Sequence, residues 1–332
     1  MLPAPISFPK RRDSFPRNRS GRLNAALRAP SRLTNLGVLL LTSLALFSLL
    51  LNLQHYFFSS DVAYAKTCGE YFEDAQSVER PASVANLKHL IIVPGHGIWT
   101  GAREREILDE DSWVLASFQR GRGRPALIAE HIARGAELTL QNQESLLVFS
   151  GGQTSPLSST TEAESYHRLA LAALYLPHKN ATGEPFQRVT TEPFALDSYQ
   201  NLLFSVARFR EYTGRYPQKI SVVGYEFKRR RFETLHRTAV RWPSAEFEYI
   251  GLSLRNQAEE DEASAGELQN SYLPYTDDLY GCHPPLSTKR RSRNPHLRVH
   301  AYHRSAPELR NLLEWCPSTT ASIFRGPLPW DT

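Results

Sequence analysis

Two glycine turns carry residue types that are suited to anion binding and proton transfer. Pro94-Gly95-His96-Gly97 follows one apolar run of the 332-residue chain, and Ser150-Gly151-Gly152 follows another. Glycines let backbone amides approach an anion closely, and an imidazole can donate a proton or hold a phosphate. The sequence therefore predicts His96 as a candidate acid beside an anion site formed by Gly95, Gly97, Gly151 and Gly152. A tight turn with a surface histidine is the alternative.

Carboxylates stand where two helices are expected to begin. Glu162 lies in Thr161-Glu-Ala-Glu-Ser165, and Asp197 opens Asp197-Ser-Tyr-Gln-Asn201. Either carboxylate would serve as a general base or bind a ribose, and Asn201 would contact a ligand from one turn inside the helix. Acidic residues at these places also cap helices and complement the helix dipole, so a purely structural role is the alternative.

A basic run forms the third cluster. Lys228-Arg229-Arg230-Arg231 follows an apolar run, and His236 comes shortly afterwards. Four bases at a helix start oppose the helix dipole, which favours a site where Arg229, Arg230 or Arg231 clamps a phosphate or carboxylate. His236 is a second candidate acid, and a solvated basic face is the alternative.

Metal-assisted hydrolysis is a weaker hypothesis for the same residues. It would draw on the following six side chains: His96, His131, His167, His236, Glu162 and Asp197. The sequence lacks HExxH and paired Cys/His spacing, so no metal ligand is predicted. It also lacks the GxGxxG dinucleotide fingerprint and the GxSxG nucleophile elbow.

An alternation of apolar runs and helical patterns must position these clusters. Strands are predicted at residues 89–93, 145–149, 188–191, 219–223 and 247–250. Helices are predicted at residues 124–141, 161–174, 198–213 and 229–241. This order predicts an α/β fold, a Rossmann-like and mostly parallel sheet with helices on both faces. Ligands bind such sheets where strands end and helices begin, which is where all three clusters fall.

Upstream of the sheet, residues 33–60 contain no charged side chain. Roughly 20 apolar residues span a bilayer as a helix, and eight bases precede this run. The asymmetry predicts a signal anchor with a cytosolic N-terminus and a lumenal body in the endoplasmic reticulum or Golgi. The alternatives are a signal peptide cleaved near Ala63-Tyr64-Ala65, a presequence leading to the mitochondrial inner membrane, and a buried soluble helix.

The net charge of +5 belongs to the N-terminal tail. Residues 1–61 carry eight basic and two acidic side chains, so residues 62–332 have a net charge of −1. Net charge therefore gives no indication of nucleic-acid binding. We predict five regions: a disordered basic tail (1–34), the anchor (35–58), a linker (59–87), the Rossmann-like domain (88–254) and an irregular C-terminal extension (255–332). One helix is expected near residues 307–315.

Three cysteines and one sequon bear on the compartment. Cys68, Cys282 and Cys316 allow three pairings, of which Cys282–Cys316 is preferred because both lie in the extension. Asn180-Ala181-Thr182 is a candidate N-glycosylation site at Asn180. Both features suit a translocated body.

The order of these clusters resembles the YdcF-like, SanA/ElyC-related family of unknown function, in its membrane-anchored fungal form. The resemblance covers residues 89–251 and is most specific from Leu196 to Arg230. The family's polar positions fall on Gly95, Gly151, Gly152, Glu162, Asn201, Arg230 and His236. Bacterial relatives have a Gly-rich turn in place of Pro94-Gly-His-Gly, and Thr-Ser in place of Val223-Gly-Tyr. The resemblance implies a Rossmann-like fold and an envelope-type location, and no settled reaction.

These observations lead to one expected function and one alternative. The first is a membrane-tethered lumenal domain that binds or acts on a phosphate-bearing, nucleotide-like or S-adenosylmethionine-like ligand, such as a lipid carrier or glycan precursor. The alternative is a non-catalytic tethered scaffold or ligand-binding protein.

Overall fold

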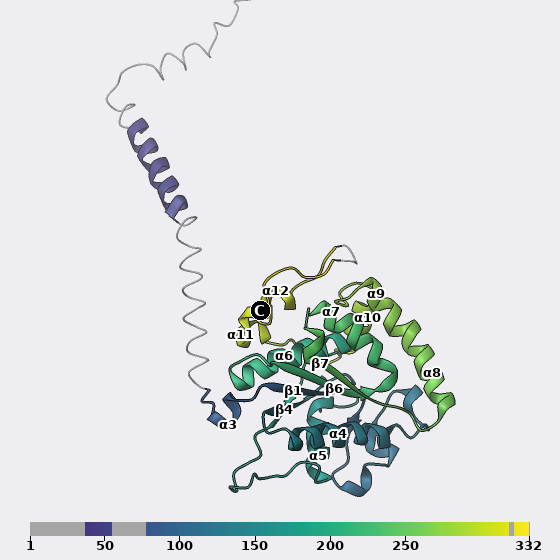
Figure 1. The fold of residues 1–332 in the computed structure, drawn as a ribbon. Helices are drawn as coiled ribbons and strands as arrows, with labels where there is room; N and C mark the ends of the chain where they lie inside the picture. Colours follow the sequence, from purple (N-terminus) through teal and green to yellow (C-terminus); the bar gives the residue numbers. More distant parts are fainter. Residues whose placement is uncertain (1–36, 55–77, 319–321, 332) are drawn as a thin grey trace, which may run out of the picture. The chain divides into compact units, whose positions relative to one another are not determined.

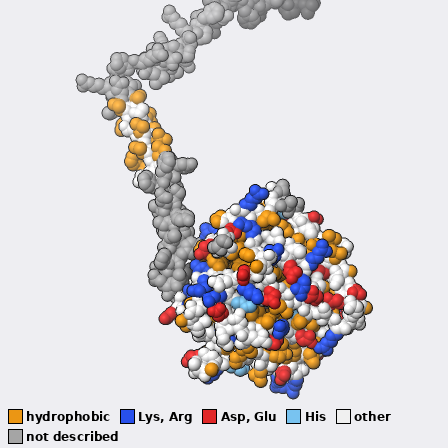
Figure 2. All heavy atoms as spheres, in the orientation of Figure 1, with side chains coloured by type: hydrophobic (Ala, Val, Ile, Leu, Met, Phe, Trp, Pro, Cys, Tyr) orange, Lys and Arg blue, Asp and Glu red, His pale blue; other side chains and the backbone are white. Residues whose placement is uncertain are grey.

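The computed structural model describes residues 37–54, 78–318 and 322–331, which fall into two separate units. In the first unit, Gly37–Gln54 forms one helix with a mean hydropathy of 1.8, long and apolar enough to cross a membrane. Its leucines are exposed, and Figure 2 shows apolar side chains over its visible surface. The predicted tail, the cleavage motif, Cys68 and the outer end of the anchor lie outside the described residues.

A five-stranded parallel sheet forms the centre of the second unit. Its strands are β1 (His89–Pro94), β4 (Ser145–Ser150), β5 (Val189–Glu192), β6 (Lys219–Tyr225) and β7 (Phe247–Leu252). They lie in the order β5-β4-β1-β6-β7, so the chain builds outward from β1 on one side and then returns to its other side (Figure 1). The predicted α/β, Rossmann-like fold class is confirmed.

Alternate residues of the strands enter two hydrophobic cores. Leu90 and Ile92 of β1 join the core under α6 (Ser198–Thr213), whereas Ile91 and Val93 join the core under α4 (Arg124–Gln141) and α5 (Glu162–Ala172). Side chains of a strand point to opposite faces in turn, so apolar runs are required where both faces are covered. The bounds of α4 and α6 match the predicted helices.

The sequence patterns did not reveal the short elements before α4. A two-stranded antiparallel sheet pairs β2 (Ile98–Trp99) with β3 (Trp113–Val114) and covers the end of β1. The remaining short helices of this region are α3 (Ala82–Ala85), η1 (Glu104–Glu106), η2 (Glu110–Ser112) and η3 (Ser117–Gln119).

The predicted helix 229–241 is divided into unlike pieces. A 3-10 turn, η4 (Glu226–Lys228), leads into a π-helix, η5 (Arg231–His236), and then into the short α7 (Arg237–Ala239). The predicted helix is therefore present, since residues 229–239 are helical, but a π-turn occupies its centre. A π-turn changes the direction in which successive side chains point, so the basic run does not present one face.

The extension is irregular in the main but opens with a helix that the sequence did not reveal. Asn256 caps α8 (Gln257–Glu267), which continues through the π-turn η7 (Leu268–Tyr272) into α9 (Leu273–Asp277). No apolar residue of α8 is buried, so it lacks the apolar periodicity that predicts a helix. The other pieces are η6 (Ser244–Glu246), α10 (Leu286–Ser292), α11 (Tyr302–Ser305), η8 (Pro307–Leu309) and α12 (Arg310–Leu313). The last two fall where one helix was expected.

Candidate functional site

The candidate site lies at the carboxyl ends of β1, β4 and β6. The strand order reverses between β1 and β6, and ligands of open α/β sheets bind at such a switch point. His96 follows β1 and Lys228 follows β6, and the Lys228 Nζ lies 3.3 Å from the His96 Nδ1 across this point. The site therefore begins with a cation and an imidazole that two different strands supply.

Glu162 occupies the space between the two glycine turns. A Cβ atom on Gly95 would lie 2.4 Å from the Glu162 Oε2, and one on Gly151 would lie 2.5 Å from it. The helix N-cap Thr161 and the bond from the Glu162 amide to the Gly152 carbonyl hold the start of α5 there. Among the residues that the structure describes, the one side chain that donates to this carboxylate is the Thr154 hydroxyl, at 2.8 Å. Both glycines are thus required for the placement of Glu162.

Burial displaces the pKa values of Glu162 and Lys228 toward 7 and lowers the pKa of His96. Burial raises the pKa of Glu162 to about 7, although Thr154 and nearby cations act in the opposite direction. Burial, helped by Arg231, lowers the pKa of Lys228 to about 7, while part of the side chain still reaches solvent. Burial and the neighbouring Lys228 hold the pKa of His96 well below its usual range. A proton acceptor and a proton donor thus titrate together near pH 7.

A layer of buried rings supports His96 from below. His131 of α4 and Tyr225 at the end of β6 lie edge-on to each other, with ring centroids 4.6 Å apart, and Tyr225 lies 4.7 Å from His96. The His96 Nε2, both nitrogens of His131 and the Tyr225 hydroxyl are buried without a protein partner. Buried polar atoms normally have hydrogen-bond partners, so the polar atoms of this layer retain hydrogen-bonding capacity that the described residues do not fill.

The backbone amides of the glycine turns are engaged inside the protein. The Gly95 amide donates to the Ser150 carbonyl at 2.7 Å, the Gly151 amide to Glu192 and the Gly152 amide to Ala195. The His96 amide donates to the Tyr166 hydroxyl. The predicted cradle of free amides is therefore not formed at Gly95, Gly151 and Gly152, because these amides extend the sheet hydrogen bonding. A Cβ on Gly97 would lie 2.9 Å from Leu115, so this glycine allows close packing of the turn.

The arginines of the basic run are directed away from Glu162. Arg229 pairs with Glu226 at 2.6 Å and with Glu233 at 3.1 Å. Arg230 is exposed and stacks over the Tyr272 ring at 4.3 Å. Arg231 forms a buried pair with Glu267 of α8 at 3.1 Å. The residue of the run that faces the site is Lys228, which the sequence analysis did not select.

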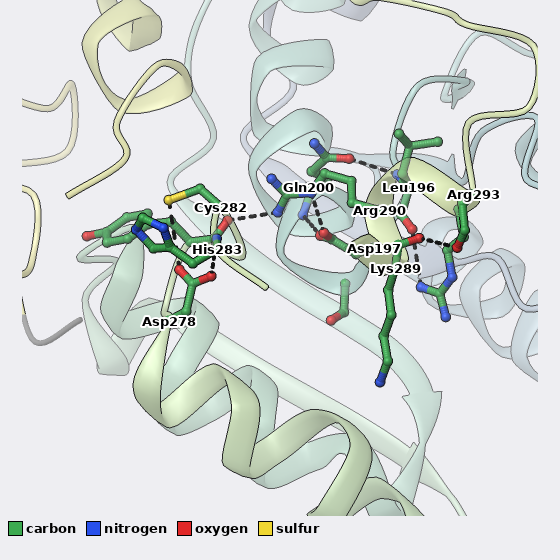
Figure 3. Close-up of polar contacts among 12 residues, drawn as sticks. Leu196, Asp197, Gln200, Asp278, Cys282, His283, Lys289, Arg290 and Arg293 are labelled. Carbon is green, nitrogen blue, oxygen red and sulfur yellow. Dashed lines mark hydrogen bonds and ion pairs between the residues drawn. The ribbon is translucent and has the colours of Figure 1, made fainter. Parts of the chain in front are cut away.

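Asp197, Asn201 and His236 have well-defined structural partners. Asp197 caps α6 through the Gln200 amide and accepts a bond of 2.6 Å from Arg290 of the extension (Figure 3). Asn201 donates to both the carbonyl and the hydroxyl of Ser150. His236 is fully buried and bonds Ser198 through Nε2.

A buried carboxylate that sequence reasoning missed stands at the end of β5. Glu192 accepts bonds from the Ser150 and Tyr302 hydroxyls and from the amides of Phe194 and Ala195. Burial raises its pKa to about 7, while these donors act in the opposite direction. Its signal was a charged residue at the end of the short β-branched strand Val189-Thr-Thr, which also suits an exposed strand end.

Cys282 and Cys316 form a disulfide, the pairing preferred from the sequence. The His283 Nε2 lies 3.8 Å from the Cys316 sulfur, and these three residues make up a compact group of potential metal ligands. Metals bind the thiolate form of cysteine, so the disulfide does not offer a metal site. Asn180 is exposed in the loop between α5 and β5.

No family model matches this chain. No solved structure matches it either. It is similar to the uncharacterized protein YOR238W of Saccharomyces cerevisiae, with 28% identity over 269 residues that cover 67% of this chain and 87% of the yeast protein. The two proteins are therefore similar over much of their length.

Proposed function

We propose that the body is a YdcF-like domain that binds and acts on a phosphate-bearing ligand at the carboxyl ends of β1, β4 and β6. The observation that carries the proposal is the placement of Glu162. Its carboxylate fills the space left by Gly95 and Gly151 and lies at the switch point with Lys228 and His96. A buried carboxylate with a purely structural role is normally surrounded by hydrogen-bond donors. The two glycine turns make room for Glu162, yet Thr154 is the one side chain that donates to it among the described residues.

Side chains hold and activate the ligand in this proposal. Lys228 attracts the phosphate, because it is a cation whose nearest polar contact is a neutral imidazole nitrogen. In hydrolysis of a phosphate ester, Glu162 accepts a proton from the attacking water as the new bond to phosphorus forms and returns it to the ester oxygen as the ester bond breaks. Glu162 suits this role, since a carboxylate with a pKa near 7 is both ionised and basic at neutral pH. His96 positions Lys228 through Nδ1. The unpartnered ring layer beneath gives His96 freedom to change its hydrogen bonding as the charge at Lys228 changes.

The charge of the site favours one ligand class over another. Lys228 is flanked by the arginines 231 and 293, both of which lower its pKa. A phosphate ester or nucleotide is attracted by such a site, whereas the cationic sulfonium of S-adenosylmethionine is repelled. Among the ligands expected from the sequence, the phosphate-bearing class therefore fits these residues best.

We further propose that the body is lumenal in the endomembrane system, tethered by the helix Gly37–Gln54. Support comes from the Cys282–Cys316 disulfide, which forms in oxidising compartments, and from the exposed sequon at Asn180. Digestion of the full-length chain from cells with an N-glycan-specific glycosidase should reduce its apparent mass, and N180Q should abolish that change. The lumenal location would be excluded if the glycosidase left the mass unchanged and a protease added on the cytosolic side digested the body.

A ligand screen of the full-length chain in detergent tests the site. Nucleotides, sugar nucleotides and polyprenyl phosphates should raise its melting temperature, because a ligand at 100 times its Kd adds about 2.7 kcal/mol of stability. K228M should lose this shift. E162Q should keep the shift but lose turnover of the bound ligand, whereas E164Q, an exposed carboxylate of the same helical turn, should behave as wild type.

Three results would count against the proposal. A shift that persists in K228M would place the ligand elsewhere. Turnover that persists in E162Q would remove the acid–base role and leave a binding protein. A folded sample that responds to no phosphate-bearing compound would favour the tethered scaffold.

A further inference from the structure

The C-terminal extension brings additional cations to the edge of the candidate site. The Arg293 guanidinium donates to the Leu196 carbonyl at 3.2 Å, and a Cβ on Gly152 would lie 3.3 Å from the Leu196 side chain. Arg293 therefore lies beside the second glycine turn. It is exposed, and its charge acts on the pKa values of both Glu162 and Lys228.

Lys289 lies four residues before Arg293 on the extension. Its ammonium group donates to the carbonyl of Asn270, three residues after Glu267, the partner of Arg231. Burial lowers the pKa of Lys289, and the like charges of Arg293 and Arg231 add to this effect. Figure 3 shows Lys289 and Arg293 projecting from the same stretch of the extension near Asp197.

The resulting cluster carries more positive than negative charge. Four cations, Lys228, Arg231, Lys289 and Arg293, face two carboxylates, Glu162 and Glu267. Glu267 is already paired with Arg231, and the cations that act on Glu162 are Lys228 and Arg293, with Lys289 four residues from Arg293 on the extension. Like charges repel one another, so such a group is stabilised by a ligand with more than one negative charge.

The segment that carries these cations is held in place by other contacts. Arg290 binds Asp197 at 2.6 Å and the Tyr280 carbonyl at 2.7 Å. His296 contacts the carbonyls of Ser155 and Ser158, both at 3.1 Å, in the loop that follows the second glycine turn. The Cys282–Cys316 disulfide closes the extension on itself. Lys289 and Arg293 are thus presented from an ordered segment.

We propose that Lys289 and Arg293 form a second anion subsite beside Lys228, so that the site takes a diphosphate ester with one phosphate on Lys228 and the other on the extension. This inference rests on the proposed function, because it extends the same site by one phosphate. It gives the extension a role in selecting the ligand, in addition to covering the core.

Calorimetric titration of the full-length chain in detergent with inorganic pyrophosphate and with orthophosphate tests the second subsite. Wild type should bind pyrophosphate at least about tenfold more tightly, the equivalent of one additional charge-assisted contact. R293Q and K289Q should each lose most of this preference while their affinity for orthophosphate changes less than about twofold. R291Q is the matched control, since Arg291 lies on the same helix, is exposed and contacts Thr288.

The outcomes separate this inference from the proposed function. Equal affinity of wild type for the two anions, or a preference that survives in R293Q and K289Q, would overturn the second subsite and leave the first. Binding of neither anion by the folded protein would overturn both. An equal loss in R291Q would show a general effect of surface charge and would also overturn the subsite.

Two sources of a diphosphate ester can then be compared. A nucleoside diphosphate and farnesyl diphosphate carry the same diphosphate group, the first on a polar nucleoside and the second on an apolar chain. The subsite predicts that R293Q weakens both by the same factor of about ten. Tighter binding of one compound by wild type would identify the source, and insensitivity of both to R293Q would overturn the proposal.

Discussion

Two buried carboxylates at neighbouring strand ends have the same pKa and opposite surroundings. Glu162 follows β4 and Glu192 ends β5, and burial raises the pKa of each to about 7. Glu192 accepts four hydrogen bonds and is completely enclosed. Glu162 is partly open to solvent, accepts one side-chain bond and lies at a switch point beside a lysine. A displaced pKa therefore does not by itself identify a functional group. The criterion that separates the two carboxylates is an incomplete set of hydrogen-bond partners.

The largest expected effect separates these roles by stability. E192A leaves two hydroxyls and two amides without their acceptor at the end of β5, and each unsatisfied buried group costs about 1–3 kcal/mol. We expect the free energy of unfolding to fall by more than about 3 kcal/mol in urea titrations. E162A should cost less than about 1 kcal/mol, because one donor that reaches solvent is released. Similar losses in both variants would remove the distinction.

The glycine turns give a second, smaller test of the Glu162 environment. In G95A, the new methyl group would lie 2.4 Å from the Glu162 Oε2, and we expect a loss of about 1–3 kcal/mol from overpacking together with loss of ligand binding. G266A is the matched control. Gly266 lies in α8 with no atom within 4 Å of its added Cβ, so the same change should add about 0.5–1 kcal/mol there. A G95A variant with unchanged stability and ligand binding would mean that the Glu162 side chain can move to make room for the methyl group.

Stability should depend on pH through Glu162. Its pKa is raised from 4.5 to about 7 in the folded chain, so its contribution is fully present below about pH 4.5 and is lost as the pH rises through 7. E162Q has no such charge to bury, so it should match wild type near pH 4 and exceed it by about 2 kcal/mol at pH 8.5, allowing for partial solvent contact. Urea midpoints across this range measure the difference. A constant difference would indicate a Glu162 that is ionised throughout.

Activity should show the corresponding optimum. Glu162 must be ionised to accept a proton, and Lys228 must be protonated to attract phosphate. Because both pKa values are about 7, the product of the two fractions is greatest near pH 7 and falls on either side. Turnover of the ligand found in the screen should therefore follow a bell-shaped profile. A single titration in that profile would remove one of the two groups from the reaction.

The sheet and the meeting of its glycine turns were predictable because they depend on local patterns. Five apolar runs gave the strands, and the 3.6-residue periodicity of Leu202, Leu203 and Val206 gave α6. Strand ends of a parallel sheet share one edge, so the positions of His96 and Glu162 at this edge followed.

The particular cation could not be predicted, because it depends on partners that are distant in sequence. Lys228 and Arg231 belong to one run of bases, yet Arg231 is paired with Glu267 of a helix that lacks an apolar face. Glu192 likewise has a partner, Tyr302, which is 110 residues away. The structural alternatives that the sequence offered were contacts within one element. The cap that Asp197 makes on α6 is a contact of this kind, and it was among those alternatives.

The smallest expected effect sharpens the comparison at the third carboxylate, Asp197. Its oxygens cap α6 and bind Arg290, so it resembles Glu192 in having partners and Glu162 in its position after a strand. D197N should cost about 1 kcal/mol or less in urea titrations, because asparagine also caps helices and only the charge facing Arg290 is removed. Ligand binding should be unchanged, because Arg290 also bonds the Tyr280 carbonyl and keeps the extension in place. A D197N variant that is stable but unable to bind pyrophosphate would instead move Asp197 into the site, and the number of partners would then fail as the criterion that separates the carboxylates.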